Sequence, residues 1–417
     1  MPYDASSMRF QDGALYIGDV SAAELVYRFG TPVYVYDAAV IQRQIDRVKR
    51  AFAALPFRPF FAMKANSNPS ILRIARESGF GCDAVSPGEI FIAKHAGFTG
   101  EEIWFTCSNV SNEDLRAIDD PSIVINVNAM SEIDRVLALK LPNDIALRVN
   151  PDVGAGHHRD VITAGESVKF GIDLGEVEQA RMVVEDGGGR VVGLHAHIGS
   201  GVDNVEPLLQ SARVLLDLAP SFPNLRWINF GGGLSVPYKP DEKEFPIEEY
   251  GAKLTALAER ELRKRNLTAI LEPGRYVVAQ SGTLIARVTA KRVSGGMTWV
   301  GVDTGFNHLV RPSKYNAYHA IVNARASETK DDVIVAGDLC ESGDVFTRAP
   351  NGEPITRAID EVRVDDLLAF RDAGAYGFSM ASEYNARSLP PEVLVENGEA
   401  RVIRERGTYQ DLLRGVR

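Results

Sequence analysis

The residues Phe60-Phe61-Ala62-Met63-Lys64-Ala65-Asn66-Ser67-Asn68-Pro69 give the first indication of the fold, because they join an apolar run to a helix start. A short apolar run is typical of a buried strand, and Asn-Pro begins helices because asparagine caps the first turn and proline fits its first position. Ser86-Pro87 repeats the signal after the apolar run Cys82–Val85, and Gly79 and Gly97 are placed to end the two helices. These residues therefore predict two successive strand-helix units.

Six further apolar runs of strand length follow the same alternation with helical patterns. The eight runs are Phe60–Met63, Cys82–Val85, Ile103–Phe105, Ile123–Val127, Ile145–Val149, Val192–Ile198, Trp227–Phe230 and Ala269–Leu271. Strands that alternate with helices favour a parallel sheet. Eight such units predict an α/β fold of the closed (β/α)8, TIM-like barrel type.

Beyond about Gly282 the pattern changes to short strand-like segments divided by turn residues. They are Leu284–Arg287, Thr298–Val302, Val333–Ala336 and Val395–Val402, which predict an all-β domain at the C-terminal end, in the form of a β-barrel. Ala14–Ile17 also reads as a strand, and we expect it to pair with this later domain. The expected division is a (β/α)8 barrel over 31–278 and a β-barrel domain made of 1–30 and 279–417.

The composition bounds the class of protein. A chain of 417 residues is long enough for two domains, and 45% hydrophobic with 24% charged residues is typical of globular proteins. No apolar run approaches the roughly 18 residues that span a bilayer, and the net charge of −10 lacks a basic block, so neither a membrane nor a nucleic acid is an expected partner. Three cysteines and a start without a secretory signal predict a cytoplasmic protein without a disulfide framework.

Polar side chains concentrate where the predicted barrel strands end, which is where the active sites of such barrels lie. They include Lys64, Asp83 with Ser86, Asn126, Arg148 with Asn150, His197 with Ser200, Gly231-Gly232-Gly233, and Glu272 with Arg275. Each has an unremarkable interpretation as a solvated strand end, a flexible turn or a surface ion pair. Their concentration instead favours one site with a Schiff-base lysine, a glycine loop for a phosphate, and an acid for a cofactor nitrogen.

His195 and His197 lie two residues apart and therefore project to the same face of a strand. Three interpretations stay open for them: a satisfied interior histidine, a pair of zinc ligands, or a ring that stacks on a cofactor. A metal-dependent barrel hydrolase is accordingly one alternative function. A binding protein that kept the fold and lost the reaction is another.

Ordered motifs along almost the whole chain resemble a known family. Met63–Asn68, His197–Asp203, Gly231–Tyr238 and Glu272–Arg275 resemble the alanine-racemase-like, fold type III decarboxylases that use pyridoxal 5'-phosphate (PLP). Arg311-Pro312, Tyr315, Tyr318-His319, Cys340–Asp344 and Gly374–Gly377 resemble more narrowly the bacterial diaminopimelate decarboxylases. Residues 154–172 resemble the family's long loop after the fifth strand.

The resemblance implies a role for each matching residue. Lys64 would form the Schiff base, His197 would stack on the PLP ring, and Glu272 would hold the pyridine nitrogen. The remaining cofactor-binding residues would be Asp83, Arg148, Ser200, Gly232, Gly233, Gly274, Arg275 and Tyr376. Cys340 would be catalytic as the proton donor, and the substrate would contact Arg275, Arg311, Tyr315, Glu341 and Tyr376.

The implied reaction converts meso-2,6-diaminopimelate to L-lysine and carbon dioxide, the last step of lysine biosynthesis. The implied assembly is a homodimer with shared active sites, and the implied partner is an amino-acid substrate. A related decarboxylase of the same fold, acting on D-lysine, D-ornithine, arginine or carboxynorspermidine, is the nearest alternative.

Overall fold

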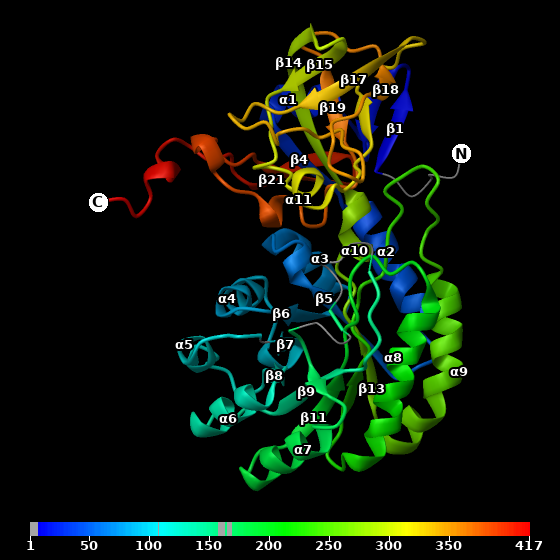
Figure 1. Cartoon of the computed structure of the whole chain (residues 1–417), viewed down its shortest axis with the longest axis vertical. Coiled ribbons are helices and arrows are strands. Elements are labelled where there is room, and N and C mark those ends of the chain that lie inside the picture. The colour runs from blue at the N-terminus through cyan, green and yellow to red at the C-terminus, as the bar shows by residue number, and fades with distance from the viewer. Residues whose placement is uncertain (1–6, 107, 157–162, 165–168) are drawn as a thin grey trace. The chain divides into compact units, whose positions relative to one another are not determined.

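The computed structural model describes residues 7–106, 108–156, 163–164 and 169–417, and its contacts divide the chain into two compact units (Figure 1). The barrel unit comprises Gln44–Val236 and Lys243–Tyr276. The β unit comprises Met1–Arg43, Pro237–Glu242 and Val277–Arg417, so it is built from both ends of the chain.

Eight parallel strands close the barrel unit, which confirms the predicted (β/α)8 fold. In ring order they are β5 (Phe57–Ala62), β6 (Gly81–Ala84), β7 (Ile103–Thr106), β8 (Val124–Val127), β9 (Ile145–Asn150), β11 (Val191–His195), β12 (Trp227–Asn229) and β13 (Thr268–Leu271). The ring is closed because β13 pairs with β5 and β8 pairs with β9. A short extra strand, β10 (Ile172–Asp173), pairs in parallel with β9 at the end of the resembled segment 154–172, of which residues 157–162 and 165–168 lie outside the described part.

Helices follow the barrel strands along the chain and surround them (Figure 1). They are α3 (Pro69–Glu77), α4 (Pro87–His95), α5 (Asn112–Arg116), α6 (Met130–Ala138), α7 (Val177–Asp186), α8 (Val205–Leu218) and α9 (Ile247–Arg265). The two expected helix starts are confirmed, because Asn68 and Ser86 accept hydrogen bonds from the first-turn amides of α3 and α4. Gly79 and Gly97 follow these helices with φ of +88° and +103°, a conformation that suits glycine.

The barrel interior is apolar in its middle and polar toward the carboxyl ends of the strands. Phe60, Trp104, Val124, Ala146, Val192 and Ile270 form a buried apolar cluster. Residues two positions apart on a strand share a face. Trp104, Val124, Ala146 and Ile270 are thus followed on their own face by Thr106, Asn126, Arg148 and Glu272, all of them buried. The strand alternation itself therefore builds a polar layer above the apolar core.

Strands dominate the β unit, as expected for the second domain. The strand β4 (Val33–Asp37) lies between the long β14 (Gly282–Ser294) and β20 (Glu392–Glu396), and so belongs to the β unit although the barrel domain was expected to begin at residue 31. The same sheet contains β15 (Met297–Val302), β16 (Ile321–Asn323), β17 (Lys330–Ala336), β18 (Arg357–Asp360), β19 (Leu367–Phe370) and β21 (Glu399–Arg404).

The N-terminal strands form a small sheet of β1 (Met8–Gln11), β2 (Ala14–Ile17) and β3 (Val20–Ser21), beside the helix α1 (Ala22–Phe29). The expectation that Ala14–Ile17 joins the later domain is confirmed, because the amide of Leu15 donates to the carbonyl of Ala324 at 3.0 Å. Helix α2 (Ala38–Ala51) then leads from the β unit into the barrel unit.

The prediction of a single strand over Val395–Val402 is wrong. The chain reverses within it, so that β20 and β21 form a hairpin across Asn397-Gly398. Both turn residues have positive φ, +53° and +81°, which is the conformation of a two-residue hairpin turn that Asn-Gly favours. The turn dipeptide was present in the sequence, between Glu396 and Glu399.

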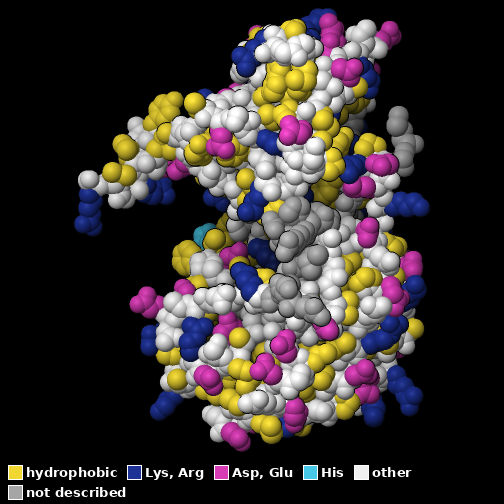
Figure 2. Space-filling model, in the orientation of Figure 1, with side chains coloured by type: hydrophobic (Ala, Val, Ile, Leu, Met, Phe, Trp, Pro, Cys, Tyr) yellow, Lys and Arg dark blue, Asp and Glu magenta, His cyan; other side chains and the backbone are white. Residues whose placement is uncertain are grey.

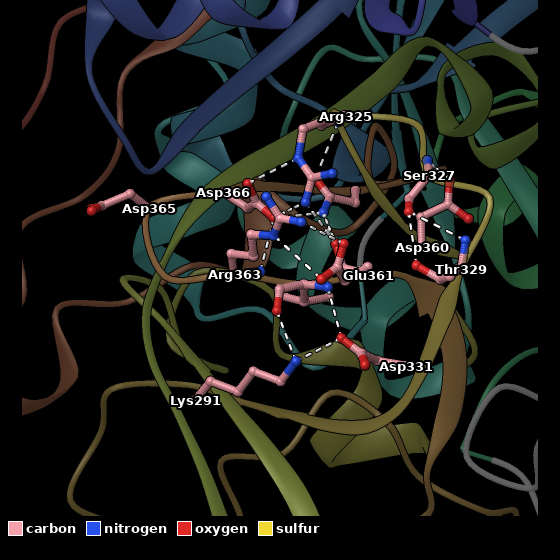
Figure 3. A network of polar contacts seen from close by, with 12 residues as sticks. Lys291, Arg325, Ser327, Thr329, Asp331, Asp360, Glu361, Arg363, Asp365 and Asp366 are labelled. Carbon is pink, nitrogen blue, oxygen red and sulfur yellow. Dashed lines mark hydrogen bonds and ion pairs between the residues drawn. The ribbon is translucent and has the colours of Figure 1, made fainter.

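A polar network ties the outer strands of the β unit together (Figure 3). Arg325 pairs with Asp366 at 3.0 Å, Arg363 pairs with Glu361 at 2.9 Å, and Lys291 pairs with Asp331 at 2.7 Å. These side chains come from β14, β17 and the loops around β16, β18 and β19. Exposed pairs of this kind contribute about 0.2 to 1 kcal/mol each, so the network fixes loop geometry more than it stabilises the unit.

The surface carries charges of both signs. Figure 2 shows Lys and Arg side chains interspersed with Asp and Glu over the visible described residues, without a broad patch of one sign. Within the described ranges, no helix is both long enough and apolar enough to cross a bilayer.

Candidate active site

Lys64 lies at the end of the first barrel strand, on the single turn η1 (Met63–Ala65) that follows β5. Its Nζ is 4.0 Å from Oδ2 of Asp83, which stands on the neighbouring strand β6. The Lys64 side chain is 39% exposed, whereas that of Asp83 is 1% exposed. The structure thus presents an accessible amine beside a buried carboxyl group at the end of the barrel.

Asp83 is held by the polar layer below the amine. The Thr106 hydroxyl donates to Asp83 Oδ1 at 2.6 Å. Burial raises the pKa of Asp83 to about 8, and nearby Glu272 adds to the rise, while Lys64 and the Thr106 hydrogen bond oppose it. The proton on this carboxyl group is therefore sensitive to the charge on Lys64.

Glu272 follows the eighth barrel strand and is 5% exposed. Its Oε2 lies 3.3 Å from His195 Nε2, and its Oε1 accepts a hydrogen bond of 2.5 Å from Asn229 Nδ2. Burial alone would raise the pKa of Glu272, but the contact with His195 and the charge of Lys64 outweigh burial and lower the pKa. Glu272 is therefore a buried acid that stays ionised.

Arg148 extends from β9 with its guanidinium 4.5 Å from the centre of the Phe170 ring. Burial lowers the pKa of Arg148 to about 10, and the carboxylates of Glu272 and Asp83 oppose this, so the side chain remains charged at neutral pH. Its Nη2 is buried and makes no hydrogen bond to any described residue. A buried charged donor of this kind calls for an acceptor.

The glycine loop after β12 approaches neighbouring backbone too closely for any side chain. A Cβ on Gly232 would lie 2.1 Å from the carbonyl oxygen of Glu272, and one on Gly233 would lie 2.1 Å from that of Gly199. The amide of Gly232 donates to His197 Nδ1 at 3.1 Å. This contact aligns the imidazole of His197, whose pKa burial lowers well below its usual value, so that the ring is neutral.

Ser200 and Arg275 come together beside this loop. Arg275 Nη2 donates to Ser200 Oγ at 3.0 Å, and the amide of Gly201 donates to the carbonyl of Gly233 at 2.9 Å. Gly274 is required for the same packing, because a Cβ there would lie 2.9 Å from the carbonyl oxygen of Ala62. Backbone amides, a hydroxyl and a guanidinium are the donors that bind phosphate.

These residues fit PLP, the cofactor that the resemblance implies. The amine of Lys64 suits its aldehyde, the ionised Glu272 suits a protonated ring nitrogen, and the glycine loop suits its phosphate. Nη2 of Arg148 and Oδ2 of Asp83 are among the buried polar atoms that lack hydrogen-bond partners in the described part of the chain. A polar cofactor would satisfy groups of this kind.

The β unit contains the other predicted site residues, and Arg311 is the most strongly constrained of them. It is 2% exposed at the start of helix α11 (Arg311–Tyr315). Its Nη1 donates to His319 Nε2 at 2.8 Å, and its guanidinium lies 4.4 Å from the centre of the Tyr238 ring. Arg311 is therefore not a solvated surface residue, and its planar group is fixed on two sides.

Cys340 begins an exposed loop that a buried acid holds in place. The amide of Cys340 donates to Asn385 Oδ1 at 2.7 Å. Asp344 accepts from the amides of Phe306 at 2.7 Å and Leu339 at 2.9 Å, and burial raises its pKa to about 6. The structure thus leaves the thiol exposed while the backbone on both sides is fixed.

The remaining predicted residues of the β unit have less defined surroundings. Glu341 is exposed and accepts a hydrogen bond from Tyr384, which raises the pKa of that phenol. Tyr315 is partly buried, with Lys314 Nζ 5.5 Å from its ring centre. Tyr376 has φ of +56° between Ala375 and Gly377, and at Gly374 a Cβ would lie 1.9 Å from the carbonyl oxygen of Val278.

Sequence reasoning gave no role to several residues that organise these side chains. Asn229 and His319 are the clearest cases, because each bonds a predicted site residue directly. Asn229 could have been found from the sequence, because it is a polar residue in the otherwise apolar strand Trp227-Ile228-Asn229. A buried polar group of this kind needs a hydrogen-bond partner.

Comparison with known proteins assigns the chain to a class. The model for the pyridoxal binding domain of pyridoxal-dependent decarboxylases matches residues 38–279. A diaminopimelate decarboxylase from Methanothermobacter thermautotrophicus is 42% identical over 416 residues, covering 97% of this chain and 95% of the relative. The one from Escherichia coli K12 is 39% identical over 398 residues, covering 92% and 93%.

Solved structures of diaminopimelate decarboxylases resemble this chain over nearly its whole length. A diaminopimelate decarboxylase crystal structure superposes with a TM-score of 0.88 at 38% identity, covering 97% of this chain and 98% of the other. The enzyme of that name from M. jannaschii, in complex with L-lysine, gives a TM-score of 0.88 at 34% identity, covering 97% and 96%.

The barrel, its lysine and glycine loop, and the matching model define the chain as a PLP-dependent decarboxylase, a carboxy-lyase whose cofactor is PLP. Within that class, the chain belongs to the diaminopimelate decarboxylase family. The relatives are archaeal as well as bacterial, so these comparisons establish the family and not a bacterial subgroup.

Proposed function

We propose that this chain removes carbon dioxide from meso-diaminopimelate to give L-lysine. The observation that carries the proposal is similarity at 34 to 42% identity, over more than nine tenths of the chain, to relatives that bear the name diaminopimelate decarboxylase. Two solved relatives, from M. jannaschii and Helicobacter pylori, were obtained with L-lysine, which would be the product here.

The barrel unit supplies the residues that would hold the cofactor. Lys64 would bind its aldehyde carbon, Glu272 would keep the ring nitrogen protonated, and His197 would stack on the ring. Asp83 and Arg148 would support Lys64 and the cofactor hydroxyl, and the phosphate would be held by Ser200, Gly232, Gly233, Gly274, Arg275 and Tyr376. Bound PLP supplies an electron sink for the pair left behind when carbon dioxide departs.

Decarboxylation breaks the bond between the substrate α-carbon and its carboxylate, so a proton must replace carbon dioxide on that carbon. We assign this proton to the Cys340 thiol. Support comes from its exposed position on a loop whose backbone is fixed by Asn385 and Asp344.

Substrate recognition has to distinguish a distal end that carries both a carboxylate and an ammonium group. Arg311 would bind the carboxylate, because a guanidinium forms paired hydrogen bonds with it. Arg275, Tyr315 and Tyr376 would add donors, and Glu341 would bind the ammonium. The support for Arg311 is its burial and its fixation by His319 and Tyr238.

The assembly we propose is a cytoplasmic homodimer in which Cys340 completes the active site of the partner subunit. Mixing inactive Lys64→Ala with inactive Cys340→Ala should then restore part of the activity, because some mixed sites would contain both native residues. Subunit exchange has to be verified by mass spectrometry. Exchange without recovered activity would refute shared sites.

A decarboxylation assay tests the substrate. We expect carbon dioxide release from meso-diaminopimelate to exceed that from D-lysine, D-ornithine and L-arginine by at least about 1000-fold in kcat/KM, because buried polar groups reject ligands that leave them unpaired. Comparable rates with D-lysine or D-ornithine would support the alternative, a related decarboxylase of the same fold. A solved lysine/ornithine decarboxylase shares this fold at 21% identity.

A further inference from the structure

Six polar side chains form a continuous chain of contacts through the barrel interior. They are Asp83, Thr106, Asn126, His195, Glu272 and Asn229, and none is more than 8% exposed. They come from β6, β7, β8, β11, the end of β13 and β12. A buried polar chain of this length is costly unless its donors and acceptors alternate consistently, so the direction of each contact can be worked out.

The direction is set at the Asp83 end. Thr106 uses its hydroxyl hydrogen for Asp83 Oδ1 at 2.6 Å, so its oxygen can only accept from Asn126, whose Nδ2 is 3.4 Å away. This places the amide nitrogen of Asn126, rather than its oxygen, next to both neighbours. The same Nδ2 lies 2.8 Å from His195 Nδ1.

The tautomer of His195 follows from this arrangement. Nδ1 faces a donor and must accept, so the ring hydrogen is on Nε2, the atom that lies 3.3 Å from Glu272 Oε2. The contact with Glu272 is electrostatic rather than a well-aligned hydrogen bond. A second proton on Nδ1 would oppose the Asn126 amide, and burial also lowers the pKa of His195, so the ring is neutral.

Glu272 is consequently approached by a donor at each oxygen. Asn229 Nδ2 donates to Oε1 at 2.5 Å, and Asn229 Oδ1 accepts from the amide of Gly231 at 2.9 Å. The carboxylate is therefore connected on one side to the glycine loop and on the other to His195. The opposite tautomer of His195 would place a lone pair against the carboxylate.

We infer that His195 is a positioning residue, which Asn126 holds in its Nε2-protonated tautomer so that Glu272 stays ionised and oriented toward the PLP ring nitrogen. This inference rests on the proposed role of Glu272. It assigns His195 no contact with PLP and no role in binding a metal. It also explains why a neutral amide occupies the centre of strand β8.

The tautomer can be measured directly on the unmodified enzyme. Uniformly 15N-labelled holoenzyme is examined by long-range 1H–15N correlation, and His195 is assigned by the loss of its signals in His195→Gln. We expect a pyridine-type Nδ1 and a pyrrole-type Nε2 from pH 6 to 8. A proton on Nδ1, alone or together with one on Nε2, would overturn the inference.

Two amide substitutions separate positioning from packing. The amide nitrogen of glutamine reaches the position of Nε2, whereas that of asparagine reaches only the position of Nδ1. His195→Gln should therefore keep PLP affinity within about threefold, and His195→Asn should weaken it by roughly tenfold or more, because the buried carboxylate loses the donor that faces Oε2. The absorbance band of bound PLP should shift in the asparagine variant alone.

Equal PLP affinity and equal spectra in the two variants would refute the inference. The outcome is independent of the substrate, because neither measurement involves decarboxylation. An enzyme that binds PLP as expected but fails to decarboxylate meso-diaminopimelate would contradict the proposed function and leave the role of His195 unaffected.

Discussion

Replacing Arg311 by lysine tests the proposed substrate site most sharply, because the change keeps the positive charge and removes the planar guanidinium group. The structure shows what is lost: the hydrogen bond of 2.8 Å to His319 Nε2 and the stacking at 4.4 Å on Tyr238. A hydrogen bond to a charged group contributes about 1.5 to 3 kcal/mol and a cation–π contact about 0.5 to 2 kcal/mol.

Stability should fall, although not by the full sum, because the lysine ammonium retains part of both interactions. We expect a loss of about 2 to 4 kcal/mol, which lowers the Tm of the affected transition by roughly 5 to 10 °C for a unit of this size. Differential scanning calorimetry measures this change. Burial raises the pKa of Asp372 to about 6, and the positive charge of Arg311 acts against this rise. A lysine at position 311 keeps that charge.

Catalysis provides the decisive comparison. A carboxylate bound by one ammonium instead of a guanidinium loses about one charged hydrogen bond, so kcat/KM for meso-diaminopimelate should fall roughly 100-fold. D-lysine has no distal carboxylate, so its slower rate should change by less than about threefold. Carbon dioxide release and the content of bound PLP are measured together.

Arg292→Lys is the matched control, because Arg292 is exposed on β14 in the same unit. It should leave both substrates and the Tm unchanged. If Arg311→Lys lowers the rates with both substrates equally, or lowers neither, then Arg311 does not bind the distal carboxylate.

Three further outcomes are expected. Lys64→Ala should abolish the adduct that borohydride traps on bound PLP, and a trapped adduct on another lysine would remove Lys64 from its role. Gly232→Ala should weaken PLP binding at least tenfold, because its Cβ would meet the Glu272 carbonyl oxygen at 2.1 Å, and unchanged binding would contradict the tight loop. Asp372→Asn should stabilise the protein by up to about 3 kcal/mol at pH 7.5 and by much less at pH 4.5, as unfolding at the two pH values would show. The sign follows because burial raises the pKa of Asp372 to about 6, so its ionisation costs stability as the pH rises from about 4 to 6; an equal effect at both pH values would refute this.

The barrel strands were predictable because buried parallel strands read as continuous apolar runs. Ile103–Phe105 and Ile145–Val149 were each placed within one residue of the observed strands. The hairpin at Asn397-Gly398 was missed although the turn dipeptide and the charged Glu396 and Glu399 beside it interrupt the apolar pattern.

The site was only partly predictable, for a geometric reason. Strand ends and strand faces can be read from a sequence, which is how Lys64, Glu272 and the glycine loop were selected. Contacts across a barrel interior also depend on the stagger of the strands, which no local pattern encodes. The contacts between Asn126 and His195 and between His195 and Glu272 therefore emerged from the structure alone, and the roles assigned to the site residues remain predictions.

The position of β4 between β14 and β20 constrains how the chain can fold during its synthesis. Its five residues, Val33–Asp37, are completely buried, yet the first residue of β14 is Gly282, 245 positions after Asp37. At about 5 to 20 residues per second, a ribosome needs roughly 12 to 50 seconds to make that interval. All eight barrel strands are made within this interval, the last of them, β13, ending 11 residues before Gly282, while the apolar strand that emerged first waits for its neighbours. Chaperone capture of the nascent chain is therefore expected to centre on its first forty or so residues, rather than on the barrel that follows them.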